Sequence, residues 1–340
     1  MTVQQGISYV LPILRRDRAE FEELTTYLRW LSDRVDLIVV DGSEPDLFRA
    51  AHEVWGAWAT HVRPVGCSLN GKVDGVTTGI GCARHEVVVV ADDDVRYDDA
   101  GLAAISAALA DSEIVRPQNY FQPLPWHAAW DSARSLLNRC FGSDSPGTLA
   151  VRRSFFLAMG GYDGDVLYEN LELLRCVAAA GGRVADRPGI YVRRLPPAPG
   201  HFWSQRSRQA YDDFAQPAKL LGFLTLLPVV AVANRRGRLV AAAAVASVAA
   251  AECGRRQHDG IAWFPGKTSL WAPIWVAERS LTVWFALIMR LTGGARYGGR
   301  RIPVAAHSRR HLRRLRTRLD RSPSVAAIAD RRHTRSPTSA

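Results

Sequence analysis

The sequence predicts an α/β fold with a mainly parallel central sheet, and two patterns lead to that prediction. Short runs of β-branched and other apolar residues alternate with longer segments of helical periodicity. The runs are apolar almost throughout, which is typical of strands that helices cover on both faces. In such folds the loops at the carboxyl ends of the parallel strands meet along one rim of the sheet, where ligands bind.

Strand and helix alternate three times in the first part of the chain. The apolar runs predict strands at residues 7–14, 36–40 and 86–91. The segments between and after them predict helices at residues 19–31, 46–58 and 72–82. A further strand is expected near residues 114–116, followed by helices at 126–140 and 169–180, and the last of these stops at a glycine pair.

The net charge of +11 is concentrated at the C-terminus. Residues 296–340 hold 13 arginines and 2 aspartates, so they account for the whole excess and the rest of the chain is balanced. A basic tail suits nucleic acid or an anionic membrane surface. Leu312, Leu315 and Leu319 recur at helical spacing among the arginines, which favours a basic helix at a membrane interface. A solvated, disordered tail is an equally good interpretation of the residues after 321. No motif for reading nucleic acid accompanies the charge, so we expect no nucleic-acid partner.

Three apolar stretches, at residues 219–233, 239–253 and 272–291, precede the tail. The first two are shorter than the roughly 20 residues that span a bilayer, and the third contains Glu278 and Arg279. A spanning hairpin of the first two would carry a basic turn across the membrane, against the positive-inside rule. We therefore expect helices that lie in or dip into the cytoplasmic leaflet; a buried helical subdomain is the alternative. The expected domains are 1–215, 216–295 (membrane-associated helices) and 296–340 (basic, partly disordered tail).

Cysteine usage and the N-terminus bear on the compartment. The five cysteines are odd in number and widely spaced, which is typical of reduced thiols in a cytosolic protein. The chain enters a strand pattern after Gln5 without the layout of a signal peptide. We expect the protein at the cytoplasmic face of the cell membrane.

The run from Val87 to Val95 carries the strongest chemical signal, because an apolar strand ends in Asp92, Asp93 and Asp94. Carboxylate oxygens at a strand end suit Mg²⁺ or Mn²⁺ bound together with substrate phosphates. The alternative is an acidic turn that caps the helix starting near residue 98 or 99. Asp41 after the second strand and Lys72 at a helix start extend the pattern to a nucleotide-diphosphate site.

With these residues the chain resembles glycosyltransferase family 2 enzymes of the GT-A fold, over roughly residues 6–215. Val39-Val40-Asp41-Gly42-Ser43 is similar to the family's nucleotide-binding strand end, and Asp92-Asp93-Asp94 to its D-x-D metal motif. Gly160-Gly161-Tyr162-Asp163 and Tyr168-Glu169-Asn170 resemble segments that face the acceptor. Gln205-Arg206-Ser207-Arg208-Gln209 resembles the Q-x-x-R-W segment. With apolar helices following, the order of parts is most similar to the ceramide-glucosyltransferase-like branch.

The resemblance implies a set of site residues. It implies catalytic roles for Glu169 and Asp163, nucleotide-sugar binding by Pro12, Asp41, Lys72, Asp92, Gln205 and Arg208, and Mg²⁺ or Mn²⁺ on Asp92, Asp94 and His201. Asn170 stands where many members have an aspartate base, and Gln209 where they have tryptophan. An amide cannot take up the proton of an acceptor, so Glu169 is the nearest replacement.

The expected function is metal-dependent, inverting transfer of a sugar from a nucleotide diphosphate, a UDP-sugar, to a lipid or lipid-linked acceptor. One alternative is a nucleotidyltransferase that makes sugar nucleotides, although Pro12-Ile13-Leu14-Arg15 replaces the Gly-rich first loop of that class. Another is a non-catalytic membrane-binding relative, which Asn170 favours.

Overall fold

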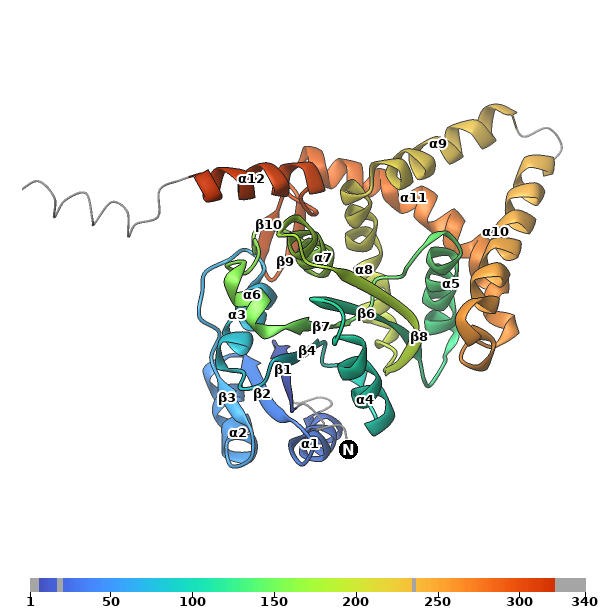
Figure 1. Cartoon of the computed structure of the whole chain (residues 1–340). Helices are drawn as coiled ribbons and strands as arrows, with labels where there is room; N and C mark the ends of the chain where they lie inside the picture. The colour runs from blue at the N-terminus through green and yellow to red at the C-terminus, as the bar shows by residue number, and fades with distance from the viewer. Residues whose placement is uncertain (1–5, 17–20, 234–236, 322–340) are drawn as a thin grey trace, which may run out of the picture.

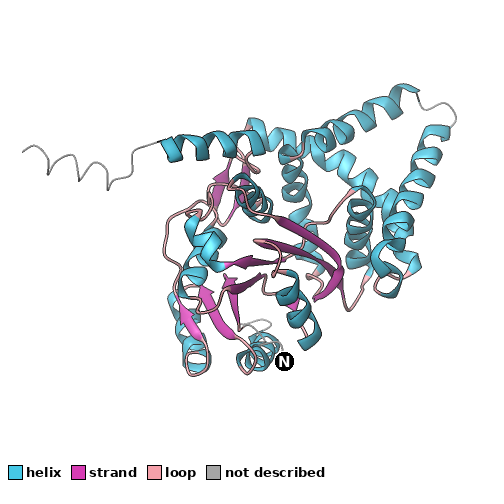
Figure 2. Cartoon of the chain, in the orientation of Figure 1, coloured by secondary structure: helices cyan, strands magenta, loops and turns pink. Residues whose placement is uncertain are grey.

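The computed structural model describes residues 6–16, 21–233 and 237–321. At its centre lies an eight-stranded sheet in the order β3-β2-β1-β4-β7-β6-β8-β5, with helices around it (Figures 1 and 2). The strands are β1 (Ile7–Ile13), β2 (Asp36–Asp41), β3 (Thr60–Val62), β4 (Val87–Ala91), β5 (Val95–Arg96), β6 (Ile114–Phe121), β7 (Thr148–Arg152) and β8 (Val184–Arg194). The helices up to β8 are α1 (Phe21–Ser32), α2 (Pro45–Trp55), α3 (Gly71–Cys82), α4 (Asp99–Ala108), α5 (Trp126–Phe141), α6 (Arg153–Ala158) and α7 (Glu169–Ala179).

Parallel pairing dominates the sheet. β3, β2, β1 and β4 run parallel to one another, and β8 runs parallel to β6. β7 is antiparallel to both of its neighbours, and β5 pairs with β8 in the same way. The predicted α/β fold with a mostly parallel sheet is therefore confirmed. β3, β5, β7 and β8 were not predicted, because they are short or carry charged residues that hide the apolar pattern.

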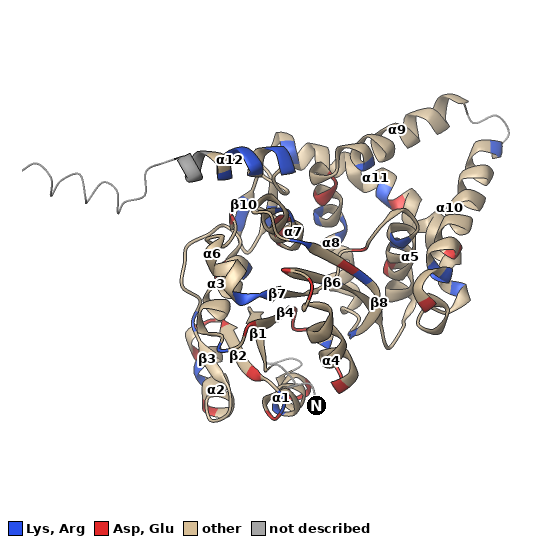
Figure 3. Cartoon of the chain, viewed as in Figure 1, with Lys and Arg blue, Asp and Glu red and all other residues tan. Residues whose placement is uncertain are grey.

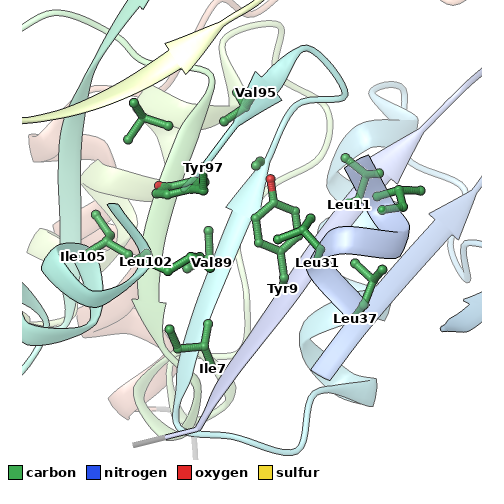
Figure 4. Packing of buried hydrophobic residues seen from close by; sticks show 14 of the residues in the cluster. Ile7, Tyr9, Leu11, Leu31, Leu37, Val89, Val95, Tyr97, Leu102 and Ile105 are labelled. Carbon is green, nitrogen blue, oxygen red and sulfur yellow. The ribbon is translucent and has the colours of Figure 1, made fainter. Parts of the chain in front are cut away.

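Helices cover both faces of the sheet. On one face, Leu28 and Leu31 of α1 and Trp55 of α2 belong to the same buried cluster as Tyr9 of β1, part of which Figure 4 shows. On the other face, α3, α6 and α7 pack against β1, β2 and β4. Burying one large aliphatic side chain stabilises a fold by roughly 1.5–3 kcal/mol. The two layers therefore hold the strand ends firmly in place at the rim.

Two helices at the rim begin with side-chain caps. Asn70 Oδ1 accepts a hydrogen bond from Lys72 N at 3.2 Å at the start of α3. Asp98 Oδ1 accepts one from Gly101 N at 2.7 Å at the start of α4. Asp98 alone therefore caps α4, and the interpretation of Asp92–Asp94 as a cap of that helix is wrong.

A helical layer follows β8. It consists of α8 (Pro199–Tyr211), η1 (Asp212–Ala215), α9 (Pro217–Ala233), α10 (Arg238–Arg256), η3 (Gln257–Ala262), η4 (Gly266–Trp271) and α11 (Ala272–Leu291). Leu136 of α5, Ala251 of α10 and Trp275 of α11 share one buried cluster. By length and composition Gly266–Leu291 could cross a membrane, yet 33% of its most apolar window is buried against the protein. Membrane association of these helices stays a prediction.

The chain then returns to the sheet domain. β9 (Ala295–Tyr297) and β10 (Arg300–Ile302) form a hairpin, and Ile302 and Ala305 are buried in a cluster with Leu167 and Tyr211. The arginine-rich α12 (Arg309–Arg321) then packs on α7 (Figure 3). Part of the expected basic tail is thus built into the body of the protein. Leu312, expected to face a membrane, is buried, whereas Leu315 is 41% exposed; the side chain of Leu319 lies outside the described residues.

Candidate active site

A large cavity lies at the rim where β1 and β4 end. Its volume is about 1030 Å³, at the upper end of the roughly 300–1000 Å³ common for ligand pockets. One side is lined by residues of the sheet and its first helices: Pro12 of β1, Lys72 of α3, Asp92 to Asp94 after β4, and Glu169 of α7. The other side is lined by His201, Gln205 and Arg208 of α8 and by Arg296, Tyr297 and Gly298 of the C-terminal hairpin. Segments from both ends of the chain therefore line one cavity.

Lys72 and Arg194 bind the acids at the end of β4. Lys72 Nζ contacts Asp92 Oδ1 and lies 2.6 Å from Glu169 Oε1. Arg194 Nε donates to Asp94 Oδ2 at 2.8 Å, and a terminal nitrogen of the same guanidinium lies 3.3 Å from Asp92 Oδ2. The floor of the cavity is therefore a network of alternating positive and negative charges.

The network determines which of these groups are charged. Burial alone would lower the pKa of Lys72, but the carboxylates of Asp92 and Glu169 raise it well above its ordinary value. Burial raises the pKa of Asp94, although Arg194 opposes the shift. Lys72 therefore stays cationic at any physiological pH.

Helix α8 contributes three predicted residues from one face, spaced four and three residues apart. His201 contacts Gln205 through its ring nitrogen, and the guanidinium carbon of Arg208 lies 5.0 Å from the centre of the Tyr297 ring. Burial and the nearby Arg208 lower the pKa of His201, so its imidazole is neutral at pH 7. A neutral imidazole is the form that binds metals.

Two predicted site residues, Asp41 and Asp163, do not line the cavity. Asp41 is fully buried, and its Oδ2 accepts hydrogen bonds from Arg15 at 3.2 Å and His61 at 3.3 Å. Although burial would raise its pKa, these groups and Ser43 lower it to about 2. Asp163 Oδ1 instead accepts a hydrogen bond from Asp165 N at 2.8 Å. Both carboxylates are used within the protein, the first to brace the loop after β2.

Asn170, at the position where the sequence resemblance implies a base, also makes a structural contact. Its amide Nδ2 donates to Pro146 O at 3.2 Å. Glu169, the predicted replacement, lies in the first turn of α7 and is ion-paired with Lys72. Neither residue offers a free carboxylate.

Several cavity residues were not predicted from the sequence. Arg194 ends β8, and Asp212 begins η1 directly after α8. Tyr297 and Arg296 belong to the hairpin inside the expected tail. The glycine pairs at 293–294 and 298–299 were the available signal for that hairpin, and all four glycines have positive φ angles.

The donor set fits a divalent cation that a diphosphate helps to bind. Mg²⁺ needs only one or two protein carboxylates when phosphate oxygens and water complete its shell. Asp94 Oδ1 is buried and has no hydrogen-bond partner among the described residues. Within that same part of the chain, no three His, Cys, Asp or Glu side chains form a ready-made metal site. The residues therefore fit a shared metal better than a site built by protein alone.

Comparison with known proteins gives no family by sequence. No protein-family profile matches the chain, and no curated protein is significantly similar to it. Among solved structures, a mannosyltransferase from Pyrobaculum calidifontis in complex with GDP-Man and Mn²⁺ is 18% identical, over 84% of this chain and 88% of that chain, with a TM-score of 0.49. Glucosyl-3-phosphoglycerate synthase from Mycobacterium tuberculosis, with Mn²⁺ and UDP-glucose, is 20% identical over 62% and 78% of the two chains, with a TM-score of 0.42. GalNAc-T7 with UDP, GalNAc and Mn²⁺ is 15% identical over 59% and 45%, with a TM-score of 0.42.

Proposed function

We propose that this protein is a glycosyltransferase that moves a sugar from a nucleotide diphosphate, a UDP-sugar, to a lipid or lipid-linked acceptor. The observation that carries the proposal is the network of Lys72, Asp92, Asp94 and Arg194 at the carboxyl end of β4, in a cavity of about 1030 Å³. Sites at this edge of a parallel sheet bind nucleotides in many α/β proteins.

The cations of the cavity suit a diphosphate. Lys72 opens α3, where the helix dipole also favours negative charge. Arg208 reaches the cavity from the opposite side and forms no ion pair within the described residues. When a divalent metal is bound to Asp92 and Asp94, with His201 as a further ligand, it would neutralise charge that develops on the leaving diphosphate.

The acceptor and the location are further parts of the proposal. Apolar side chains of α9 and α11 are exposed, among them Val232 at 90% and Leu291 at 79%. Basic and apolar surfaces together favour binding to the cytoplasmic face of an anionic membrane. A lipid-linked acceptor would reach the cavity from that surface. With the acceptor and the leaving diphosphate on opposite sides of the sugar, a single displacement inverts the anomeric carbon.

Isothermal titration with UDP-glucose, UDP-GlcNAc and GDP-mannose, with and without Mn²⁺, tests the donor half of the proposal. Wild-type protein is expected to bind one of them more tightly with Mn²⁺. Asp94→Ala should remove that metal dependence. Asp46→Ala is the matched control, because the side chain of Asp46 is 88% exposed on α2.

Two outcomes would contradict the proposal. One is wild-type protein that binds none of the three nucleotide sugars. The other is metal-dependent binding that Asp94→Ala leaves unchanged.

A further inference from the structure

The acids that line the cavity differ in whether they are paired. Asp92, Asp94, Asp131, Glu169 and Asp213 each lie within 4 Å of a lysine or arginine nitrogen. Of the seven lining acids, only Asp93 and Asp212 form no side-chain hydrogen bond or ion pair within residues 6–16, 21–233 and 237–321. Asp93 is exposed in the turn after β4. Asp212 is therefore the half-buried carboxylate of the cavity that remains free to react.

The residues around Asp212 hold it in place without neutralising it. Its neighbour Asp213 is buried and lies 3.2 Å from Arg279 and 3.7 Å from Lys219, which anchors η1 against α11 and α9. Asp212 follows α8 directly, so it lies on the same wall as Arg208. The short helix thus presents one anchored and one free carboxylate.

We propose that Asp212 is the catalytic base that accepts the proton of an acceptor hydroxyl, an assignment that rests on the transfer reaction proposed above. Glu169 is poorly suited to that role, because its Oε1 already accepts a hydrogen bond from Lys72 Nζ at 2.6 Å. Asn170 has no carboxylate. Asp212 lines the same cavity as both.

The charges that face Asp212 tune it for proton transfer near neutral pH. Burial raises its pKa to about 7, while Arg279 of α11 and Arg208 of α8 oppose the shift, and Glu169 of α7 and Asp213 add to it. The half-buried phenol of Tyr168 stays protonated, because partial burial and the charge of Asp212 raise its own pKa. A base is most effective when its pKa lies near the working pH.

The step balances as a single displacement. The acceptor O–H bond breaks and its proton passes to an Asp212 oxygen while the new bond from oxygen to the anomeric carbon forms. The bond from the anomeric carbon to the diphosphate breaks, and the nucleotide diphosphate leaves with that electron pair. A phosphate acceptor needs no base because its second pKa of about 6 leaves it ionised at pH 7. Asp212 therefore indicates a hydroxyl acceptor.

The test measures how fast nucleotide diphosphate is released from the nucleotide sugar that wild-type protein binds. Two compounds serve as probes for the acceptor hydroxyl: water, and diacylglycerol in phosphatidylglycerol vesicles. Wild-type turnover should fall about tenfold per pH unit below the pKa of the base. Asp212→Asn should lower turnover about 10²- to 10⁴-fold at pH 8 and remove this pH dependence, with donor affinity changed less than threefold. Asp111→Asn, an exposed carboxylate after α4, is the control and should behave as wild type.

A melting curve separates a catalytic loss from misfolding. The pKa of Asp212 is higher folded than unfolded, so ionised Asp212 destabilises the fold as pH rises toward 7. Asp212→Asn should therefore melt at or above the wild-type temperature at pH 8. The assignment would be overturned if Asp212→Asn kept the turnover and the pH profile of wild-type protein. It would also be overturned if wild-type protein bound the donor but transferred sugar to neither probe. Absence of donor binding in wild-type protein would overturn the proposed function instead.

Discussion

Lys72 is the residue that joins the two halves of the site. It comes from the first turn of α3, and its ammonium bridges Asp92 from the end of β4 and Glu169 from the start of α7. Hydrogen bonds to charged groups contribute about 1.5–3 kcal/mol each. One side chain therefore fixes two loops and supplies positive charge for a diphosphate.

Replacing Lys72 by methionine tests both roles. We expect nucleotide-sugar affinity to fall about 10- to 100-fold, because one charged contact to phosphate is lost. The free energy of unfolding should fall by about 1–3 kcal/mol, because Glu169 keeps no cation. Titration calorimetry and urea unfolding measure the two effects. Lys267→Met, an exposed lysine of η4, is the control, and equal effects of the two variants would refute the role of Lys72.

At the level of elements, α10 and α5 approach each other unusually closely at Gly254. A Cβ atom added to Gly254 would lie 2.0 Å from Leu136 O and 2.9 Å from Cys140 N. Both of these atoms belong to the backbone of α5, so neither can turn aside. The contact also supports Arg139, whose guanidinium donates to Gly254 O at 3.1 Å.

Gly254→Ala should therefore separate the two helices. We expect the free energy of unfolding to fall by about 1–3 kcal/mol, as for other overpacked sites. The matched control is Gly222→Ala in α9, where a new Cβ meets no atom within 4 Å. That substitution should stabilise the helix by about 0.5–1 kcal/mol. Thermal or urea unfolding measures both variants, and a neutral Gly254→Ala would show that the helices can move apart freely.

A second inter-element contact ties the C-terminal segment to α7. His307 donates from its backbone N to Glu172 Oε2 at 2.7 Å, and its ring Nδ1 lies 2.9 Å from Glu172 Oε1. Glu172 is fully buried. The hydrogen bond to Glu172 raises the pKa of His307, although burial opposes the shift. The contact with Glu172 therefore holds the segment before the last helix on α7, and it is strongest when the ring is protonated.

This contact should make stability depend on pH with a defined sign. Because the folded pKa of His307 exceeds the unfolded value of about 6.5, its contribution is complete below that pH and is lost as pH rises through the folded pKa. The difference in unfolding free energy between wild type and His307→Asn should be largest near pH 6 and shrink toward pH 9. Melting curves across this range measure it. The exposed His258 provides the control His258→Asn, and a pH-independent difference for His307→Asn would contradict the mechanism.

For the whole molecule, the basic and apolar surfaces lie toward one edge. α12 and α9 lie along the top of the view in Figure 1, where α11 slopes down beneath α9, and Figure 3 shows the basic residues of α12 at this edge. The hairpin between α11 and α12 lines the cavity on this side. A membrane bound at this edge would lie next to the hairpin.

Vesicle sedimentation tests that arrangement. Wild-type protein should bind vesicles containing phosphatidylglycerol better than neutral vesicles, and binding should weaken with salt. Each arginine near an anionic surface contributes about 1 kcal/mol to the free energy of membrane binding. The double variant Arg310→Gln/Arg314→Gln should therefore bind vesicles about 25-fold more weakly at low salt. The control is the double variant Arg49→Gln/Arg187→Gln, which changes the net charge by the same amount at exposed positions far from α12 in the sequence. It should have little effect on vesicle binding. Equal losses for the two pairs would mean that net charge, and not this edge, drives binding.

The sequence by itself determined the parts of the fold that local patterns encode. The strands β1, β2 and β4, the capped start of α3 and the position of Asp92 to Asp94 at a strand end all follow from runs of neighbouring residues. They were predictable because hydrophobic period and capping act over a few residues. The same patterns brought Lys72 and Asp92 forward as candidates, whereas Glu169 came from the family resemblance.

Only the tertiary structure decided how those candidates are used. Arg194 reaches the acids from a position 100 residues after Asp94, and the hairpin lines the cavity from inside a segment that reads as a basic tail. Asp41 is hydrogen-bonded to Arg15 and His61, whereas the carboxylate of Asp212 has no hydrogen-bond or ion-pair partner in the part of the chain that the structure describes. Which charges meet in a cavity depends on strand order and helix packing, and these arise from contacts between residues far apart in the sequence.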